Sequence, residues 1–153
     1  MLTQETINKI KEITRDFFQK TTLDVEIDFS SEKEGVLPID IKSEEPQILI
    51  GEGGQTLIEI QHLLKLTLRK KIQEEFYIDL DVNNYKKKKI EYLKEVAKSN
   101  ADDVAISKKE KELAPMPAYE RRIIHLELQN RTDVIGESVG EGPERRIVIK
   151  PKL

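Results

Sequence analysis

The sequence contains no cysteine and no tryptophan among its 153 residues. Without cysteine it forms no disulfide and no thiolate metal site, which fits a reducing cytoplasm, where we expect the protein. Its 2 histidines lie far apart in the sequence, so we expect no zinc site and no other cofactor. No apolar run approaches the roughly 18 residues of a membrane span, and the start lacks the order of a signal peptide. Direct membrane insertion is therefore not expected.

Aromatic residues make up only 5% of the chain, so side chains on which bases could stack are few. The net charge of −3 hides an asymmetry between the halves. Residues 1–83 hold 10 Lys/Arg and 17 Asp/Glu, whereas residues 84–153 hold 16 Lys/Arg and 12 Asp/Glu. An acidic half followed by a basic half predicts two modules, of which the second is better suited to a polyanion.

The hydrophobic pattern of the first half predicts the order α-β-β-α-α-β. We expect helices over Leu2–Lys20, Glu44–Ile50 and Gln55–Glu74, and strands over Leu23–Phe29, Leu37–Lys42 and Phe76–Val82. Pro38 has no N–H to donate to a ladder, so its strand is expected at an edge of the sheet. The predicted fold is α+β, with the helices on one face of a three-stranded sheet.

The pattern of the second half predicts the order α-β-α-β-β, a small sheet covered by two helices. We expect helices over Tyr85–Lys111 and Ala118–Gln129, an extended segment over Leu113–Pro117, and strands over Val134–Val139 and Arg145–Ile149. The two prolines of the extended segment exclude a helix there. Asn83 and Asn84 mark the expected junction between the two halves.

Three glycines within four residues precede the helix expected at Gln55. Gly51, Gly53 and Gly54 adopt positive φ readily and place no side chain between the backbone and a ligand. A helix N-terminus also offers unpaired N–H groups and the positive end of the helix dipole, which together favour a phosphate. The glycines alone leave two interpretations open, a phosphate site or a packing corner.

Arg121 and His125 are four residues apart and therefore lie one turn apart on one face of a helix. A guanidinium and an imidazole aligned in this way can bind adjacent phosphates, or one phosphate and a base. Arg122 lies beside them, and the closing hairpin adds four more cations: Arg145, Arg146, Lys150 and Lys152. These residues form a binding site if they converge, and otherwise they are an ordinary charged surface.

Four lysines, Lys86–Lys89, occupy the first turn of the long helix of the second half. Cations are unfavourable there because of the helix dipole. The run is either a solvated face or a basic handle for phosphates, and the sequence leaves both open.

Two stretches resemble known domains. Residues 119–125 read Tyr-Glu-Arg-Arg-Ile-Ile-His, and together with the hairpin 134–149 they closely resemble the R-3-H domain, named for its Arg-x-x-x-His. Residues 50–57 resemble the G-x-x-G turn of a KH domain. With both motifs in this order, over nearly the whole chain, the sequence resembles the Jag family (SpoIIIJ-associated, also called KhpB or EloR).

The resemblance implies a bacterial cytoplasmic RNA-binding protein with a KH-like domain at 1–83 and an R-3-H domain at 84–153. Single-stranded RNA is the implied partner, with single-stranded DNA as a variant, and a KH domain binds about four nucleotides. The family is linked to control of cell elongation and division and to a partner KH protein. Many members carry a further N-terminal domain, whereas here the first expected helix begins almost at Met1.

The expected nucleic-acid-binding residues are Gly51, Glu52, Gly53, Gly54, Arg121, Arg122, His125, Arg145, Arg146 and Lys150. The variable loop positions of KH domains are usually basic or neutral, whereas here they are Glu52 and Gly53. We therefore expect binding to depend chiefly on the C-terminal basic face, with the glycine turn secondary. The alternative is an interaction or homodimerisation module with a degenerate KH domain. An enzyme is not expected, because no nucleophile or paired base accompanies either histidine and no Walker-type loop is present.

Overall fold

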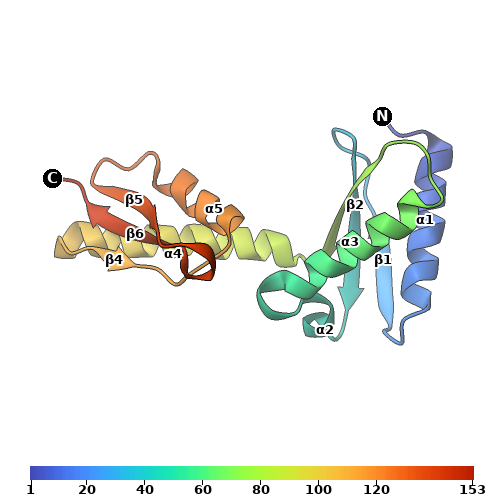
Figure 1. Cartoon of the computed structure of the whole chain (residues 1–153), viewed down its shortest axis with the longest axis horizontal. Coiled ribbons are helices and arrows are strands. Elements are labelled where there is room, and N and C mark those ends of the chain that lie inside the picture. Colours follow the sequence, from blue (N-terminus) through green and yellow to red (C-terminus); the bar gives the residue numbers. More distant parts are fainter. The chain divides into compact units, whose positions relative to one another are not determined.

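The computed structural model describes all residues from Met1 to Leu153. Their contacts divide the chain into two compact units, Met1–Lys86 and Lys87–Leu153. Each unit contains one three-stranded sheet with helices packed on it, which confirms the α+β prediction (Figure 1). None of the helices combines the length and the apolar character that crossing a membrane would require.

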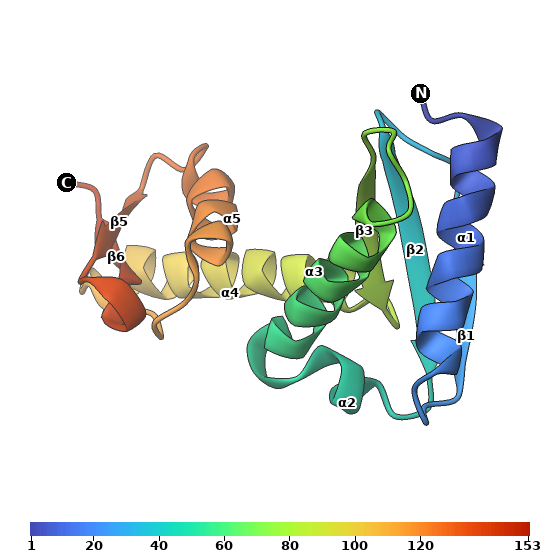
Figure 2. The same ribbon diagram turned by 45° about the vertical axis from the view of Figure 1, so that its right-hand side comes forward.

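The first unit has the expected order of elements. These are α1 (Gln4–Gln19), β1 (Val25–Phe29), β2 (Val36–Ser43), α2 (Pro46–Ile50), the 3-10 turn η1 (Glu52–Gly54), α3 (Gln55–Arg69) and β3 (Tyr77–Val82). Strand β2 pairs antiparallel with β1 and parallel with β3. In Figure 2, α1 lies over β1 and α3 lies over β3.

The core of the first unit lies between its sheet and α1 and α3. Leu37, Ile39 and Ile41 alternate along β2 and are at most 1% exposed. They pack with Ile10 of α1 and Leu64 of α3, both of which are fully buried. The residues between them in β2 point to the other face of the sheet, which no helix covers.

The expectation that Pro38 places its strand at an edge is wrong, because β2 is the central strand. Phe29 pairs with Ile39, so Pro38 lies opposite Ser30, one residue beyond the end of β1. The Pro38 carbonyl accepts a hydrogen bond from the Ser30 amide at 3.3 Å, and its nitrogen faces the same side. The missing N–H therefore falls where the neighbouring strand has already ended, and it interrupts no ladder.

Helix α3 ends at Arg69 rather than at the expected Glu74. Glu74 instead reaches the first turn of α1, where its carboxylate accepts hydrogen bonds from the hydroxyls of Thr3, at 3.0 Å, and Thr6. A carboxylate is favoured at a helix N-terminus by the unpaired N–H groups and the dipole. These bonds lower the pKa of Glu74, with the Thr6 bond as the largest cause. Glu74 therefore belongs to the cap of α1 rather than to α3.

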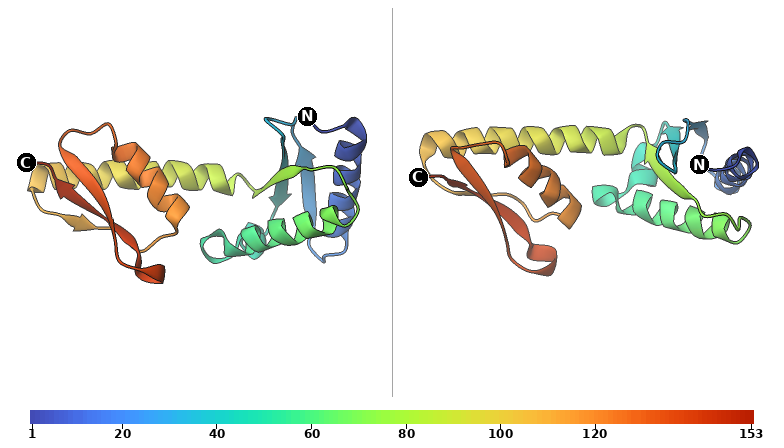
Figure 3. Two further views of the ribbon diagram at one scale, coloured as in Figure 1. Left: turned by 45° about the horizontal axis from the view of Figure 1, so that its top comes forward. Right: turned by 90° about the horizontal axis from the view of Figure 1, so that it is seen from above.

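The second unit also follows the expected order of elements. These are α4 (Tyr85–Ser107, which begins in the first unit), β4 (Lys111–Glu112), α5 (Ala118–Leu128), β5 (Val134–Val139), the 3-10 turn η2 (Gly142–Glu144) and β6 (Arg146–Pro151). Strand β6 is central and antiparallel to both neighbours. Ile147 and Ile149 of β6 pack against Ala97 and Ala101 of α4 and Ile124 of α5. Figure 3 shows α5 beside the β5–β6 hairpin.

Helix α4 ends at Ser107, four residues before the expected Lys111. Lys108 adopts a φ of 59°, the left-handed conformation that commonly ends a helix. The chain then enters β4, where Lys111 pairs with Ile149 and Glu112 with Val148. The first strand of this sheet therefore precedes the segment 113–117 where we expected it, because two residues are too few to show alternation.

Candidate nucleic-acid interface

A groove of about 550 Å³ opens in the second unit between α5 and the edge strand β5. The cations that line it without a carboxylate partner are Arg121, Arg122 and His125 of α5, Arg145 before β6, and Lys152 after it. No aspartate or glutamate lines this groove. A concave surface with several cations and no carboxylate attracts anions, even in a chain whose net charge is −3.

Packing of α5 sets which of its side chains face the groove. Ile124 is 0% exposed and Leu128 is 5% exposed, and both join the core on the sheet. This contact fixes the rotation of α5 about its axis. Arg121 and His125, one turn apart, then lie together at the rim of the groove. The local spacing thus predicted correctly that this pair shares one surface.

Two arginines of the groove are held by backbone carbonyls. Nη1 of Arg121 donates to the carbonyl of Met116 at 2.6 Å, and Nη1 of Arg145 donates to the carbonyl of Gly140 at 2.8 Å. A carbonyl orients a guanidinium without neutralising its charge. Because each guanidinium has five N–H donors, both arginines keep donors for a phosphate.

Gly136 of β5 forms the wall of the groove beside His125. A Cβ at this glycine would lie 3.0 Å from Cδ1 of Leu128 and 3.5 Å from Nδ1 of His125. Since Nδ1 faces the strand, Nε2 is directed away from it and is the nitrogen available to a ligand. Gly136 was not among the site residues expected from the sequence, although a glycine inside a strand is a known sign of close approach by another group.

Arg131 also lines the groove, but its charge is neutralised. Its Nη1 lies 2.6 Å from Asp102 and its Nη2 lies 2.7 Å from Asp133. The hydrogen bond to Arg131 lowers the pKa of Asp133 to about 2, and the bonds to Asp133 and Asp102 raise the pKa of Arg131. Arg131 therefore links α4 to the start of β5 through two ion pairs and does not provide an unpaired charge for a ligand.

The structure does not bring Arg146 and Lys150 to the groove. Alternation along β6 turns Ile147 and Ile149 towards the helices, so Arg146 and Lys150 face the opposite side of the sheet. Nε of Arg146 lies 2.9 Å from Glu112, and Nζ of Lys150 lies 2.6 Å from Glu137. Both pKa values are raised, in each case chiefly by the hydrogen bond to the carboxylate. Arg145 and Lys152 are the hairpin cations that do face the groove.

The glycine turn stands at the start of α3, with φ of 71° at Gly51, 60° at Gly53 and 82° at Gly54. Two of the three have no room for a side chain. A Cβ at Gly51 would collide with Oγ1 of Thr56, and one at Gly54 would lie 2.9 Å from Cε1 of Tyr85. A Cβ at Gly53 would meet nothing within 4 Å. Packing thus explains Gly51 and Gly54, and only the tip of the turn is open to a ligand.

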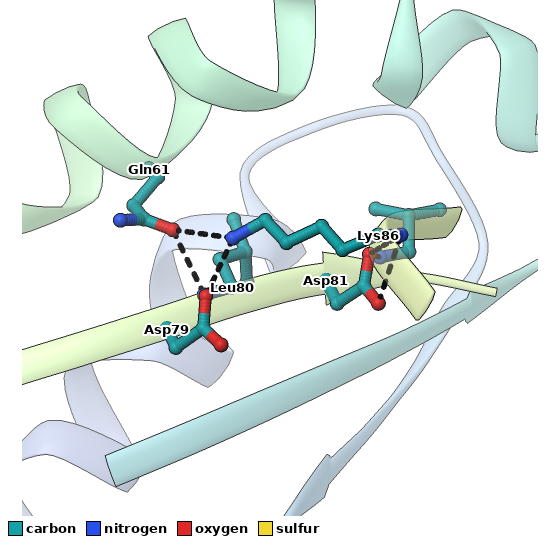
Figure 4. A network of polar contacts seen from close by, with 6 residues as sticks. Gln61, Asp79, Leu80, Asp81 and Lys86 are labelled. Atoms are coloured by element: carbon teal, nitrogen blue, oxygen red, sulfur yellow. Dashed lines mark hydrogen bonds and ion pairs between the residues drawn. The ribbon is translucent and has the colours of Figure 1, made fainter. Parts of the chain in front are cut away.

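The first lysine of the run at the start of α4 is held by carboxylates of β3 (Figure 4). Nζ of Lys86 lies 2.5 Å from Asp79 and 3.3 Å from the side-chain oxygen of Gln61. The backbone N–H of Lys86 donates to Asp81 at 3.1 Å. These two aspartates offset the unfavourable position of the cations at the helix N-terminus.

The last lysine of the run is paired within the second unit. Nζ of Lys89 lies 3.7 Å from Glu120, which is only 5% exposed. Lys87 and Lys88, between the two paired lysines, are exposed and have no carboxylate partner. Half of the run is therefore structural, and half of it is a solvated face.

Known proteins resemble both units of this chain. The model of the R-3-H domain family matches residues 91–151. The RNA-binding protein KhpB of Clostridium symbiosum is 37% identical over 130 residues, which cover 85% of this chain and 58% of that protein. The RNA-binding protein KhpB of Bacillus subtilis (strain 168) is 37% identical over 114 residues, 73% of this chain and 55% of that protein. The chain spans about half the length of these curated relatives.

Proposed function

The chain belongs to the Jag/KhpB family, and on that premise we propose that it binds single-stranded RNA, chiefly through the groove of its R-3-H domain. The observation that carries the proposal is the set of five cations, Arg121, Arg122, His125, Arg145 and Lys152, around a groove without any carboxylate. The relatives are named RNA-binding proteins, which agrees with an anionic ligand for this groove.

The groove offers two kinds of contact. The guanidinium groups of Arg121 and Arg145 bind phosphate oxygens, which supply affinity without reading sequence. Leu126 of α5, which lines the groove, is 56% exposed and gives unpaired bases an apolar surface. His125 also lines the groove, and its Nε2 can bond to a phosphate or a base edge.

We propose that the first unit is a KH-like domain and that its glycine turn is a secondary RNA contact. The order α-β-β-α-α-β with the turn between α2 and α3 supports this assignment. Glu52 and Gly53 at the tip of the turn are exposed, and the carboxylate of Glu52 opposes a phosphate there. This unit therefore contributes less to affinity than the groove does.

The test is a titration of labelled single-stranded RNA with the whole chain and two variants. Arg121→Ala should weaken binding about tenfold, the loss of about 1.4 kcal/mol that one charge-assisted hydrogen bond supplies. Gly53→Asp should have a smaller effect, because it adds a charge and strain at the secondary site only. The ranking of the two sites is wrong if Gly53→Asp abolishes binding and Arg121→Ala leaves it unchanged. The same titration with single-stranded DNA shows whether the protein distinguishes ribose from deoxyribose.

A second candidate function, an interaction module that forms a homodimer or binds a partner KH protein, is favoured by three apolar residues of α3. Ile58, Leu63 and Leu66 are 55%, 54% and 45% exposed. A stable dimer in sedimentation experiments, without salt-dependent RNA binding, would select this candidate.

For the RNA-binding candidate, the proposed role is control of cell elongation and division in the bacterial cytoplasm, as the family resemblance implies.

A further inference from the structure

Strand β1 forms one edge of the first sheet, with only β2 beside it. The Ser30 amide donates to the Pro38 carbonyl, which sets the phase of the ladder between these two strands. In an antiparallel pair the residues that bond to the neighbour alternate with residues whose backbone groups point away. The backbone N–H and C=O groups of Val25, Ile27 and Phe29 therefore face the open edge. Such an edge is a template for a further strand.

A groove of about 440 Å³ lies beside this edge, on the helix side of the sheet. Phe18 of α1 and Leu23, Val25 and Ile27 of the chain around β1 supply its apolar lining, and Arg15, Gln19 and Asp24 supply its polar lining. Leu23, Val25 and Ile27 are half-buried, so part of their apolar surface remains uncovered. Apolar side chains from every second position of an added strand would enter this groove.

The other face of the same sheet is acidic. Asp28 pairs with Asp40, and Asp40 pairs with Asp81, so three carboxylates form a row across the three strands. Glu26 lies on the same face of β1, two residues before Asp28. Like charges directly opposite each other destabilise a sheet, and Lys42, 3.5 Å from Asp28, offsets only part of this repulsion.

We propose that the edge of β1 is a docking site for an extended segment of a partner protein that alternates basic and apolar residues. The segment adds to the sheet as a fourth strand and bonds to the outward backbone groups of β1. Its apolar residues enter the groove below the sheet, and its basic residues lie beside Glu26 and Asp28 above it.

The charges decide between the possible occupants of this edge. A second copy that paired antiparallel through its own β1 would place its Glu26 and Asp28 on the same face as these carboxylates, and the two sets would repel each other. RNA is repelled by the acidic row for the same reason. A protein segment that alternates basic and apolar residues bonds to the outward backbone groups of β1, places apolar side chains in the groove, and pairs with the acidic face.

The probe is a short synthetic peptide that alternates lysine and valine, titrated at low salt into the isotopically labelled whole chain. NMR shifts should be confined to β1 and its groove, and the amides of Val25, Ile27 and Phe29 should gain protection from exchange. A matched peptide that alternates glutamate and valine keeps the apolar pattern and should not bind. Equal binding of both peptides, or shifts centred elsewhere, would overturn the proposal.

Two sets of substitutions test the contacts separately. Together, Glu26→Gln and Asp28→Asn should weaken binding of the lysine peptide about fivefold, the loss of two partly screened ion pairs. Glu59→Gln, which removes an exposed carboxylate of α3, is the matched control and should change nothing. Unchanged affinity in the double variant would refute the role of the acidic face.

Ile27→Pro removes an N–H that faces the open edge and no bond to β2, so it should abolish peptide binding in a folded chain. If this variant does not fold, the test is the affinity of the lysine peptide for the double variant with Glu26→Gln and Asp28→Asn. Self-association that Ile27→Pro abolishes would assign the edge to a second copy instead. Arg121→Ala should bind the peptide normally, which separates this proposal from RNA binding in the second unit.

Discussion

Arg145 and Arg146 are adjacent in sequence, but they face opposite sides of the second sheet. Arg145 lines the basic groove and is held there by the carbonyl of Gly140 at 2.8 Å. Arg146 lies on the far side and pairs with Glu112 at 2.9 Å. Changing either residue to alanine removes one positive charge from nearly the same place in the chain. The two variants therefore separate a specific phosphate contact from general attraction between charges.

We expect Arg145→Ala to weaken binding of single-stranded RNA about tenfold, since a hydrogen bond to a charged group contributes about 1.5 kcal/mol. Arg146→Ala should change the affinity less than about twofold, because screening at about 0.1 M salt limits the reach of a charge to about 10 Å.

The assay is fluorescence anisotropy of labelled RNA over a series of salt concentrations. The slope of log K against log salt should become shallower by about 0.7 in Arg145→Ala, the loss of one neutralised phosphate, and should stay unchanged in Arg146→Ala. Equal losses in both variants would show that the groove makes no specific contact and would refute the reasoning from strand alternation.

Three further predictions test other parts of the structure. Glu52→Lys should tighten RNA binding at low salt, and unchanged affinity would count against a phosphate at the glycine turn. Gly136→Ala should weaken RNA binding and displace the His125 ring in NMR spectra, because the new Cβ would lie 3.0 Å from Leu128 and 3.5 Å from His125. Folding lowers the pKa of Asp133 from 3.8 to about 2. The ionised carboxylate, paired with Arg131, therefore stabilises the fold fully above pH 4, and this contribution is lost as the pH falls through 2. Asp133→Asn should accordingly lower the Tm at pH 7 but not below pH 2, as measured by calorimetry; a constant difference would contradict the assignment.

Local patterns in the sequence were enough to predict the α+β class, the order of elements in both halves and the shared helix face of Arg121 and His125. These features depend on periods of 2 and 3.6 residues, which express how neighbouring side chains point from one backbone. The glycine turn was predictable from residue type, because Gly51, Gly53 and Gly54 adopt positive φ without steric cost.

Only the tertiary structure decided which of these residues are open to a ligand. Thr56 leaves no room for a side chain at Gly51, and Tyr85 leaves none at Gly54; both contacts depend on where these side chains lie in three dimensions. Arg146 pairs with Glu112, 34 residues away in sequence, and no local period reports such a partner.

The same reason explains the errors in the predicted elements. Pro38 fits a central strand because β1 ends beside it, and α3 stops at Arg69 while Glu74 bonds to the first turn of α1. In both cases the deciding feature is where a distant segment lies, which the local pattern of the chain does not report. The sequence by itself thus determined the order of the elements and which cations and glycines they carry, and packing between elements determined which of these residues line the groove.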